Sequence, residues 1–243
     1  MAYNNTVKND CQRRKGAYKK MKEKDCPKEL RAIKDGTFAT VDEKGCPQAR
    51  IIDVMLVDDE RIYFCTSRGK DFHHQLMRDG KVAVAAMNDR YQMIRATGTA
   101  QKLDDERKWI DRIFKENPVM NDVYPGESRY VLDPFYVDID WMEFFDLGKH
   151  PIYRETFDMA ARRSSSGGSG DRTDGEAAPK GFHITDDCIG CGICSENCPQ
   201  QCISEGAPYH IRQEHCLHCG LCAESCPAGA VVANRPACSK GGE

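Results

Sequence analysis

The sequence contains no apolar run that approaches the roughly 20 residues of a membrane-spanning helix. Its first 16 residues, MAYNNTVKNDCQRRKG, also lack the apolar stretch that characterises a secretory signal. Both absences argue against a membrane partner, and together they predict a cytoplasmic location.

The sequence has little excess of either charge, because 35 Lys and Arg residues stand against 38 Asp and Glu residues, for a net charge of -3. The excess acid lies in residues 181–243, which hold 7 acidic and 3 basic residues. A basic run from Arg13 to Lys24 has no recognisable nucleic-acid-binding motif, so we interpret it as a solvated helix face. We therefore expect no nucleic-acid partner.

Cysteine, by contrast, is abundant, and its 14 residues are unevenly distributed. Ten of the 14 follow residue 187, whereas Cys11, Cys26, Cys46 and Cys65 are scattered without metal-ligand spacing. The cytoplasm keeps thiols reduced, so a cysteine cluster in such a chain indicates metal binding rather than a disulfide framework.

The clustered cysteines form two copies of the run Cys-x2-Cys-x2-Cys-x3-Cys-Pro. This run resembles that of bacterial ferredoxins, in which three cysteines of one run and the fourth of the other hold one [4Fe-4S] cluster. We therefore predict two clusters, one on Cys188, Cys191, Cys194 and Cys226, and a second on Cys198, Cys216, Cys219 and Cys222.

Three glycines within the runs, Gly190, Gly192 and Gly220, would let backbone N–H groups approach the cysteine sulfurs. Two structural zinc sites are the alternative, since zinc also uses Cys-x2-Cys pairs, but four-ligand zinc sites leave the regular repeat unexplained. Cys202 and Cys238 exceed the eight predicted ligands, and we interpret them as free thiols.

Short strand patterns separated by turn residues dominate the first part of the chain. We predict strands over residues 37–41, 49–57, 61–66, 81–87, 91–103, 129–133 and 135–147. Helices are predicted over the first ~30 residues with an interruption or restart at Pro27, over Lys70–Met77 before Gly80, and from an N-cap at Asp104 to Pro118. Such a mixture predicts a small β-barrel with helical additions.

Residues 162–180 consist largely of Ser, Gly, Asp and Ala, and they include the run SSSGGSG. This composition is typical of a flexible connector. We therefore predict a first domain over residues 1–161, a linker over residues 162–180, and a ferredoxin-like domain over residues 181–243.

The stretch QARIIDVMLVDDERIYFCTSRGK, residues 48–70, resembles the FMN-binding split-barrel superfamily of the pyridoxamine 5'-phosphate oxidase and flavin reductase type. The likeness extends loosely over residues 25–160. It consists of a strand beginning at Arg50, a hairpin to a strand ending in Thr66 and Ser67, a helix opened by Lys70, and a long strand from Gln92 to Leu103.

The resemblance implies an α+β, mostly β fold, in which an FMN-binding split β-barrel with flanking helices precedes the small 2[4Fe-4S] ferredoxin-like domain. It implies that Arg50, Ser67 and Lys70 bind the FMN phosphate, and that backbone around Cys65 and Thr66 touches the flavin. An arginine fork, a lysine charge and donors at a helix start suit a phosphomonoester. In the alternative interpretation, Arg50 and Lys70 are ordinary surface charges.

Other residues have two interpretations each. Gln92 or Arg95 reaches the isoalloxazine or the ribityl chain, or else faces solvent. We expect His73 and His74 on the surface. The family forms homodimers, and the aromatic strand over residues 141–145 packs against a partner or belongs to the core.

Together these features predict an oxidoreductase in which two [4Fe-4S] clusters exchange electrons with FMN and a small organic substrate is reduced. The alternatives are an electron-transfer protein without a substrate of its own and a flavin-binding redox sensor. The C-terminal substrate-binding segment of pyridoxamine 5'-phosphate oxidase is missing, which argues against vitamin B6 oxidation. The catalytic residues and the substrate stay unassigned, and the acidic tail predicts docking of a redox partner.

Overall fold

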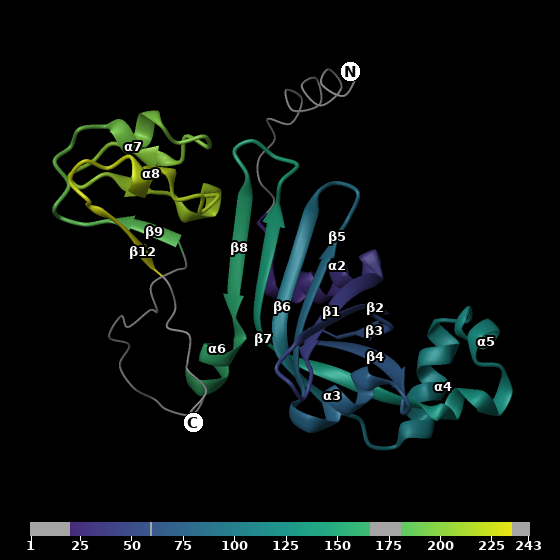
Figure 1. Cartoon of the computed structure of the whole chain (residues 1–243). Coiled ribbons are helices and arrows are strands. Elements are labelled where there is room, and N and C mark those ends of the chain that lie inside the picture. The colour runs from purple at the N-terminus through teal and green to yellow at the C-terminus, as the bar shows by residue number, and fades with distance from the viewer. Residues whose placement is uncertain (1–19, 59, 166–180, 235–243) are drawn as a thin grey trace, which may run out of the picture. The chain divides into compact units, whose positions relative to one another are not determined.

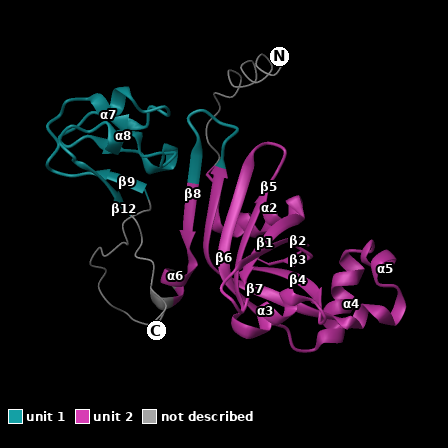
Figure 2. Ribbon diagram, in the orientation of Figure 1, with its two compact units in different colours: residues 1–18, 146–154, 169–243 teal, residues 19–145, 155–168 magenta. Residues whose placement is uncertain are grey.

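The structure is a computed structural model that describes residues 20–58, 60–165 and 181–234. The predicted helix before residue 20, most of the predicted linker, Cys11 and Cys238 lie outside these ranges. The chain divides into two compact units, coloured separately in Figure 2. We call residues 19–145 with 155–168 the sheet unit, and residues 1–18, 146–154 and 169–243 the cysteine unit. The segment 146–154 therefore belongs with the C-terminal residues.

The sheet unit is built on one eight-stranded sheet that curls around its core (Figure 1). The strand order is β2-β1-β5-β6-β7-β4-β3, and β8 pairs with β7. Five ladders, β1–β2, β1–β5, β5–β6, β4–β7 and β3–β4, are antiparallel. The strands are β1 (Asp35–Val41), β2 (Pro47–Asp53), β3 (Leu56–Val57), β4 (Arg61–Ser67), β5 (Lys81–Met87), β6 (Gln92–Lys102), β7 (Leu132–Asp146) and β8 (Tyr153–Asp158).

Helices flank this sheet, so the predicted mostly β fold with helical additions is confirmed. The helical segments are η2 (Glu23–Asp25), α2 (Cys26–Ile33), α3 (Asp71–Asp79), α4 (Glu106–Glu116), α5 (Met120–Val123), η3 (Gly126–Val131) and α6 (Met159–Ser165). Helix α6 occupies residues 162–165, the first four of the predicted linker.

Local sequence signals account for several element boundaries. Pro27 occupies the first turn of α2, where a missing N–H costs no hydrogen bond, so the helix restarts there. Gly80 ends α3 with a left-handed backbone, φ 67°, as predicted. Asp42 closes the β1–β2 hairpin, because its Oδ1 accepts hydrogen bonds from the backbone N–H groups of Lys44 and Cys46, both at 2.9 Å.

The predicted strand over residues 49–57 is wrong, because the chain forms two strands, β2 and β3, on either side of Val54 and Met55. Val54 N donates to Lys34 O at 2.8 Å, and Met55 N donates to Tyr63 O at 2.8 Å. The backbone thus leaves β1 and joins β4 within two residues. Such a change of pairing partner depends on strands that are distant in the sequence, so the local alternation of polar and apolar residues does not reveal it.

Two further boundaries differ from the predictions. The N-cap of α4 is Asp105, in a left-handed conformation, rather than Asp104. Residues 129–131 belong to the 3-10 helix η3, and β7 begins only at Leu132. Strand β8 was not predicted at all, because its sequence YRETFD alternates polar and apolar residues too weakly to indicate a strand.

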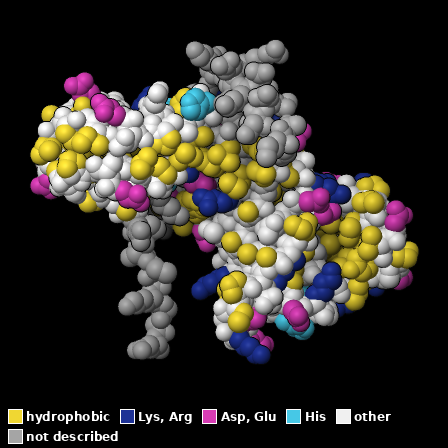
Figure 3. Space-filling view, turned by 45° about the horizontal axis from the view of Figure 1, so that its top comes forward, with side chains coloured by type: hydrophobic (Ala, Val, Ile, Leu, Met, Phe, Trp, Pro, Cys, Tyr) yellow, Lys and Arg dark blue, Asp and Glu magenta, His cyan; other side chains and the backbone are white. Residues whose placement is uncertain are grey.

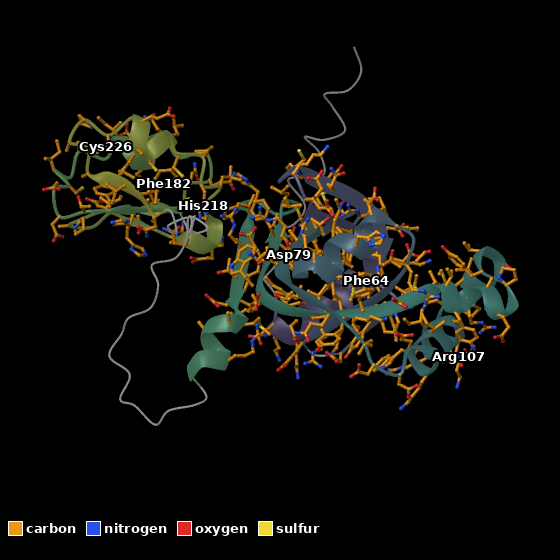
Figure 4. All side chains as sticks on the ribbon, turned by 60° about the horizontal axis from the view of Figure 1, so that its bottom comes forward. Phe64, Asp79, Arg107, Phe182, His218 and Cys226 are labelled. Carbon is orange, nitrogen blue, oxygen red and sulfur yellow. The ribbon has the colours of Figure 1, made fainter. Side chains whose placement is uncertain are left out.

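Four phenylalanine rings pack together in the core of the sheet unit, and each is at most 4% exposed: Phe38, Phe64, Phe72 and Phe135. The centroid of the Phe64 ring lies 5.1 Å from that of Phe38, 5.7 Å from that of Phe72 and 5.6 Å from that of Phe135. Figure 4 labels Phe64 inside the curl of the sheet. Because Phe72 belongs to α3, this packing fixes that helix, and the loop before it, against the sheet.

The cysteine unit contains two short antiparallel ladders and two short helices (Figure 1). Strand β9 (Gly181–Ile184) pairs antiparallel with β12 (Val231–Asn234), and β10 (Ile203–Ser204) pairs with β11 (His210–Ile211). Helices α7 (Ile193–Glu196) and α8 (Leu221–Glu224) contact each other, and η4 (Gln213–His215) precedes the second cysteine run. The small core includes Cys202, Ile203, Ile211 and Val231. None of the helices described in either unit is both long and apolar enough to cross a membrane.

Candidate functional site

Two cavities in the cysteine unit contain the eight cysteines of the repeated runs. The first cysteine cavity is lined by Cys188, Cys191, Cys194 and Cys226. The second cysteine cavity is lined by Cys198, Cys216, Cys219 and Cys222. Each cavity therefore brings together three cysteines of one run and the fourth of the other. These are the two sets of four that the sequence analysis grouped.

The two runs fold alike around these cavities. Gly192, with φ 79°, precedes α7, and Gly220, with φ 86°, precedes α8, so a left-handed glycine begins each helix. A Cβ atom on Gly192 would lie 3.4 Å from the Tyr209 hydroxyl, and one on Gly220 would lie 3.4 Å from Phe182 Cζ. Each glycine thus lets an aromatic ring approach the backbone beside one cavity.

The donor set fits an iron–sulfur cluster. Four cysteines of the repeated runs line each cavity, and soft thiolate ligands favour [4Fe-4S] clusters or zinc. Within the described ranges, no three His, Cys, Asp or Glu side chains converge closely enough to hold one metal ion.

A fifth cysteine, Cys202, lines the second cavity, and only 1% of its surface is exposed. Its sulfur lies 3.5 Å from the sulfur of Cys198. A hydrogen bond from the Cys202 thiol lowers the pKa of Cys216 to about 6, with help from the His218 N–H and the Arg154 charge and against the opposing effect of burial. Cys202 is therefore the thiol donor and Cys216 the thiolate acceptor of this pair.

Arg50 lies on β2 with its side chain directed against α3 rather than into open solvent. Its Nη1 donates to Thr40 Oγ1 at 2.6 Å and to Phe38 O at 3.3 Å, and its Nη2 donates to Gln75 Oε1 at 3.0 Å. The guanidinium carbon lies 4.5 Å from the centre of the Phe72 ring. These contacts hold the arginine fork beside the first two turns of α3. The sequence analysis missed Thr40 and Gln75 as its partners.

The loop before α3 carries the other residues that the resemblance singled out. Ser67 ends β4, Lys70 is the N-cap residue of α3, and Lys70 N donates to Ser67 O at 3.1 Å. No side-chain bond caps α3, so its first N–H groups stay available to an anion. Thr66 is 2% exposed, and its Oγ1 has no hydrogen-bond partner in the part of the chain that the structure describes. Burial raises the pKa of Cys65 to about 12, so this thiol stays protonated at neutral pH.

Gln92 lies apart from this group, at the β5–β6 hairpin. Its Oε1 accepts a hydrogen bond from Asn88 Nδ2 at 3.0 Å. Arg50 pairs with Phe38, Phe38 with Val84, and Val84 with Ala96, so Arg50 is level with Ala96 on β6. Gln92 lies four residues before Ala96, which is roughly 13 Å along the strand. Arg95, on the same strand as Gln92, forms an ion pair with the buried carboxylate of Glu143.

His73 was predicted on the surface, and this prediction is wrong. Its side chain is buried, and its Nε2 lies 2.8 Å from Oδ2 of Asp133, which is 1% exposed. Arg68 Nη1 and Lys102 Nζ each lie 3.0 Å from the same carboxylate. These hydrogen bonds hold the pKa of Asp133 below its ordinary value, although burial alone would raise it. The sequence did hold a signal of this burial, because His73 precedes the buried Leu76 by three residues and therefore lies on the same face of α3.

The aromatic strand over residues 141–145 belongs to the interior of the chain. Met142, Glu143, Phe144 and Phe145 are each at most 8% exposed. Of the two interpretations of this strand, the structure therefore favours the core.

Comparisons with known proteins agree with the two-part organisation. Residues 23–122 match the family described as pyridoxamine 5'-phosphate oxidase, and residues 187–230 match the family described as 4Fe-4S dicluster domain. A ferredoxin from Butyribacterium methylotrophicum is 53% identical over 30 residues, which are 12% of this chain and 54% of the relative. The chain thus spans about half the length of this curated relative.

Two solved structures match part of this chain. A protein related to general stress protein 26, of the pyridoxinephosphate oxidase family, from Clostridium acetobutylicum is 17% identical, with a TM-score of 0.48 over 58% of this chain and 99% of the other. A NimC/NimA family protein from the same organism is 19% identical, with a TM-score of 0.46 over 56% of this chain and 92% of the other.

The chain combines a domain of the pyridoxamine 5'-phosphate oxidase family with a 4Fe-4S dicluster domain of the ferredoxin type. The resemblance stated from the sequence is thereby confirmed for both parts. These two domains indicate electron transfer by a flavin-binding and iron–sulfur protein.

Proposed function

We propose that the chain is an oxidoreductase in which two [4Fe-4S] clusters exchange electrons with one FMN, and that these electrons reduce a small organic substrate. The observation that carries this proposal is the sorting of the eight cysteines of the repeated runs into two cavities, four of them in each. It supports two clusters rather than one, and it occurs in a chain that also contains a pyridoxamine 5'-phosphate oxidase-type domain. When bound, the clusters would supply single electrons, and FMN would store two electrons with two protons.

The ligands of the proposed clusters are the eight cysteines of the runs. Cys194, Cys216 and Cys222 are buried, whereas Cys191 and Cys219 are exposed, so one edge of each site faces solvent. Apolar side chains also lie exposed beside the cysteines, with Ile189 at 68% and Leu221 at 40%. Hydrophobic side chains cover much of this unit on the face that Figure 3 shows. Such an edge would allow a redox partner to approach closely.

The proposed phosphate site is the N-terminal half of α3. Arg50 would bind the phosphate with its planar fork, Lys70 would add a point charge, and Ser67 would add a hydroxyl donor. The contacts from Arg50 to Thr40 and Gln75 keep the fork oriented before the phosphate arrives. The backbone at Cys65 and Thr66 would border the flavin. Gln92 would contact the flavin beyond the ribityl chain, which is consistent with the distance between Gln92 and Arg50.

We also propose that the chain forms a homodimer through the outer face of β2, β1 and β5. Most side chains on this face are small or apolar, with Asp35, Asp53 and Lys81 at the strand ends, and Ile51 is 63% exposed and Met87 52% exposed. The register aligns them in rows across the three strands. The face comprises Pro47, Ala49, Ile51, Thr37, Ala39, Val41, Ala83, Ala85 and Met87. An exposed apolar sheet of this kind is typical of a surface that another protein covers.

The test of the proposal is the content of iron, sulfide, zinc and flavin, with the visible spectrum, in the full chain purified without oxygen. We expect about eight iron atoms and one FMN per chain. We then expect a reduced sample to return two electrons to a small organic acceptor. Iron without flavin would leave a ferredoxin-type carrier, and zinc without iron would overturn the proposal.

The same sample separates the proposed enzyme from its alternatives. An electron carrier would reduce protein acceptors and flavin pools but would show no saturable turnover of any small substrate. A sensor would hold flavin and clusters without sustained turnover of either kind. The predicted cytoplasmic location stays a prediction.

A further inference from the structure

The two cysteine runs differ at a position where the backbone is left-handed. Gly190 lies two residues after the first cysteine of the first run, with φ 70°. The equivalent residue of the second run is His218, with φ 56°. Non-glycine residues rarely adopt this conformation, and they do so only where their surroundings hold them there. His218 N donates a hydrogen bond to Cys216 Sγ at 3.3 Å, so its backbone touches a predicted ligand.

The surroundings that hold His218 come from segment 146–154, which connects β7 to β8 and belongs to the cysteine unit. Arg154 Nη1 lies 2.5 Å from Nδ1 and 2.9 Å from Nε2 of the His218 ring. In Figure 4, His218 is labelled apart from Cys226, which belongs to the first cavity. The arginine therefore brings a permanent positive charge to His218, the residue whose backbone N–H donates to Cys216.

Backbone hydrogen bonds fix the position of this charge. Ile152 N donates to Gln200 Oε1 at 2.9 Å, and Gln200 lines the second cavity. Ile152 O lies 2.9 Å from Nδ1 of His215, the residue before Cys216. Ile152 and Arg154 thus contact three residues: Gln200, which lines the second cavity, and His215 and His218, which flank Cys216. The first run, with Gly190 in place of His218, has no side chain at that position to hold an arginine.

We propose that Arg154, held by His218, raises the reduction potential of the second cluster above that of the first. The electron shared by the two clusters then rests on the cluster ligated by Cys198, Cys216, Cys219 and Cys222. This inference rests on the proposed function and adds to it a direction of electron transfer, from the first cluster to the second. Transfer from the first cluster to the second oxidises one and reduces the other by one electron, and no bond is formed or broken.

The physical reason is the charge that reduction adds. A cluster gains one negative charge when it accepts an electron, and a fixed positive charge nearby stabilises that state. Net charge, hydrogen bonds to the sulfurs and solvent exposure are the main determinants of cluster potential. Arg154 supplies the first determinant, and the His218 N–H supplies the second. A neighbouring charge of this kind changes such an equilibrium by about tenfold.

The experiment is a potentiometric titration of the anaerobically purified full chain, followed by electron paramagnetic resonance. We expect two one-electron steps at different potentials in the unmodified protein. Arg154→Gln should lower only the higher potential, by about tenfold in the equilibrium constant, or about 59 mV. Arg154→Lys, which keeps the charge, should retain most of the original value. Arg78→Gln, which removes a hydrogen-bonded arginine from the sheet unit, is the matched control and should change neither potential.

A second variant locates the effect on the second cluster. His218→Gly copies Gly190 and releases Arg154, so it should lower the same potential, and the double variant should add little to either change. Iron content is measured first in every variant. Full iron with unchanged potentials in Arg154→Gln, or an equal fall in both potentials, would overturn this inference and leave the clusters in place. Absence of iron from the unmodified protein would instead overturn the proposed function.

Discussion

The thiol sulfur of Cys202 lies 3.5 Å from that of Cys198 inside the second cysteine cavity. The cavity therefore contains five cysteines, although a [4Fe-4S] cluster takes four cysteine ligands. Of Cys198 and Cys202, only Cys198 belongs to a repeated run. The hydrogen bond from Cys202 lowers the pKa of Cys216, one of the eight predicted ligands, to about 6. This relationship assigns different roles to two neighbouring thiols.

The first prediction separates these roles by iron content. Cys219→Ala should remove about half of the iron, because one of the two clusters loses a ligand. Cys202→Ala, a change of the same size in the same cavity, should retain all of it. Iron and sulfide per chain are measured on protein purified without oxygen. Retention of all iron in Cys219→Ala, or loss of half in Cys202→Ala, would contradict the ligand assignment.

The second prediction concerns the buried carboxylate of Asp133. Asp133→Asn should destabilise the sheet unit by about 3 kcal/mol, because Arg68, Lys102 and His73 lose their charged acceptor. Urea unfolding followed by tryptophan fluorescence measures this unit, since the chain's two tryptophans, Trp109 and Trp141, both belong to it. The exposed Asp89→Asn is the control. Unchanged stability in Asp133→Asn would mean that this network contributes little.

The same residue predicts a dependence on pH. The pKa of Asp133 is lowered in the folded chain, so the unfolded state binds its proton at higher pH than the folded state does. Its contribution to stability is therefore fully present above the unfolded pKa of about 4 and is lost as the pH falls through the folded pKa. Asp133→Asn should flatten the loss of stability below about pH 4. Equal acid sensitivity in both proteins would argue against this account.

The third prediction tests the close approach of β6 and β7. A Cβ atom on Gly98 would lie 2.1 Å from Asp138 O, so no side chain fits without moving one strand. Gly98→Ala should destabilise the sheet unit by about 1–3 kcal/mol. Gly69→Ala is the matched control, because a Cβ atom there would meet nothing within 4 Å. The measurement is again urea unfolding, and equal stability of the two variants would count against the packing of these strands.

Local patterns predicted the features that depend on neighbouring residues. The spacing of the cysteine runs grouped the residues that line each cavity, and Gly80 ended α3 as expected. The apolar face of α4 is buried at Ile110, Ile113 and Phe114, in agreement with its helical periodicity. These features follow from a few consecutive residues, so one sequence is enough to find them.

Contacts between distant residues were not predictable in the same way. Thr40 and Gln75 contact Arg50 only because β1 pairs with β2 while α3 packs against β1. The pairing of Arg154 with His218 joins residues 64 positions apart. Such partners cannot be recognised from residue type or spacing in the sequence, because the register and packing of the whole fold determine which residues contact each other.

The fourth prediction tests the phosphate site with two ligands that differ only in the phosphate. Arg50→Ala with Lys70→Ala should weaken FMN binding by roughly 100-fold, because two charge-assisted contacts to the phosphate are lost. Riboflavin has no phosphate, so its affinity should be the same in the variant and the original protein. Lys108→Ala with Lys115→Ala removes two exposed charges from α4 and should change neither affinity. Both ligands are titrated by quenching of flavin fluorescence, and the preference for FMN over riboflavin should disappear only in the Arg50 and Lys70 variant. A variant that keeps this preference would place the phosphate elsewhere, whereas equal weakening of both ligands would indicate damage to the barrel rather than loss of the phosphate contacts.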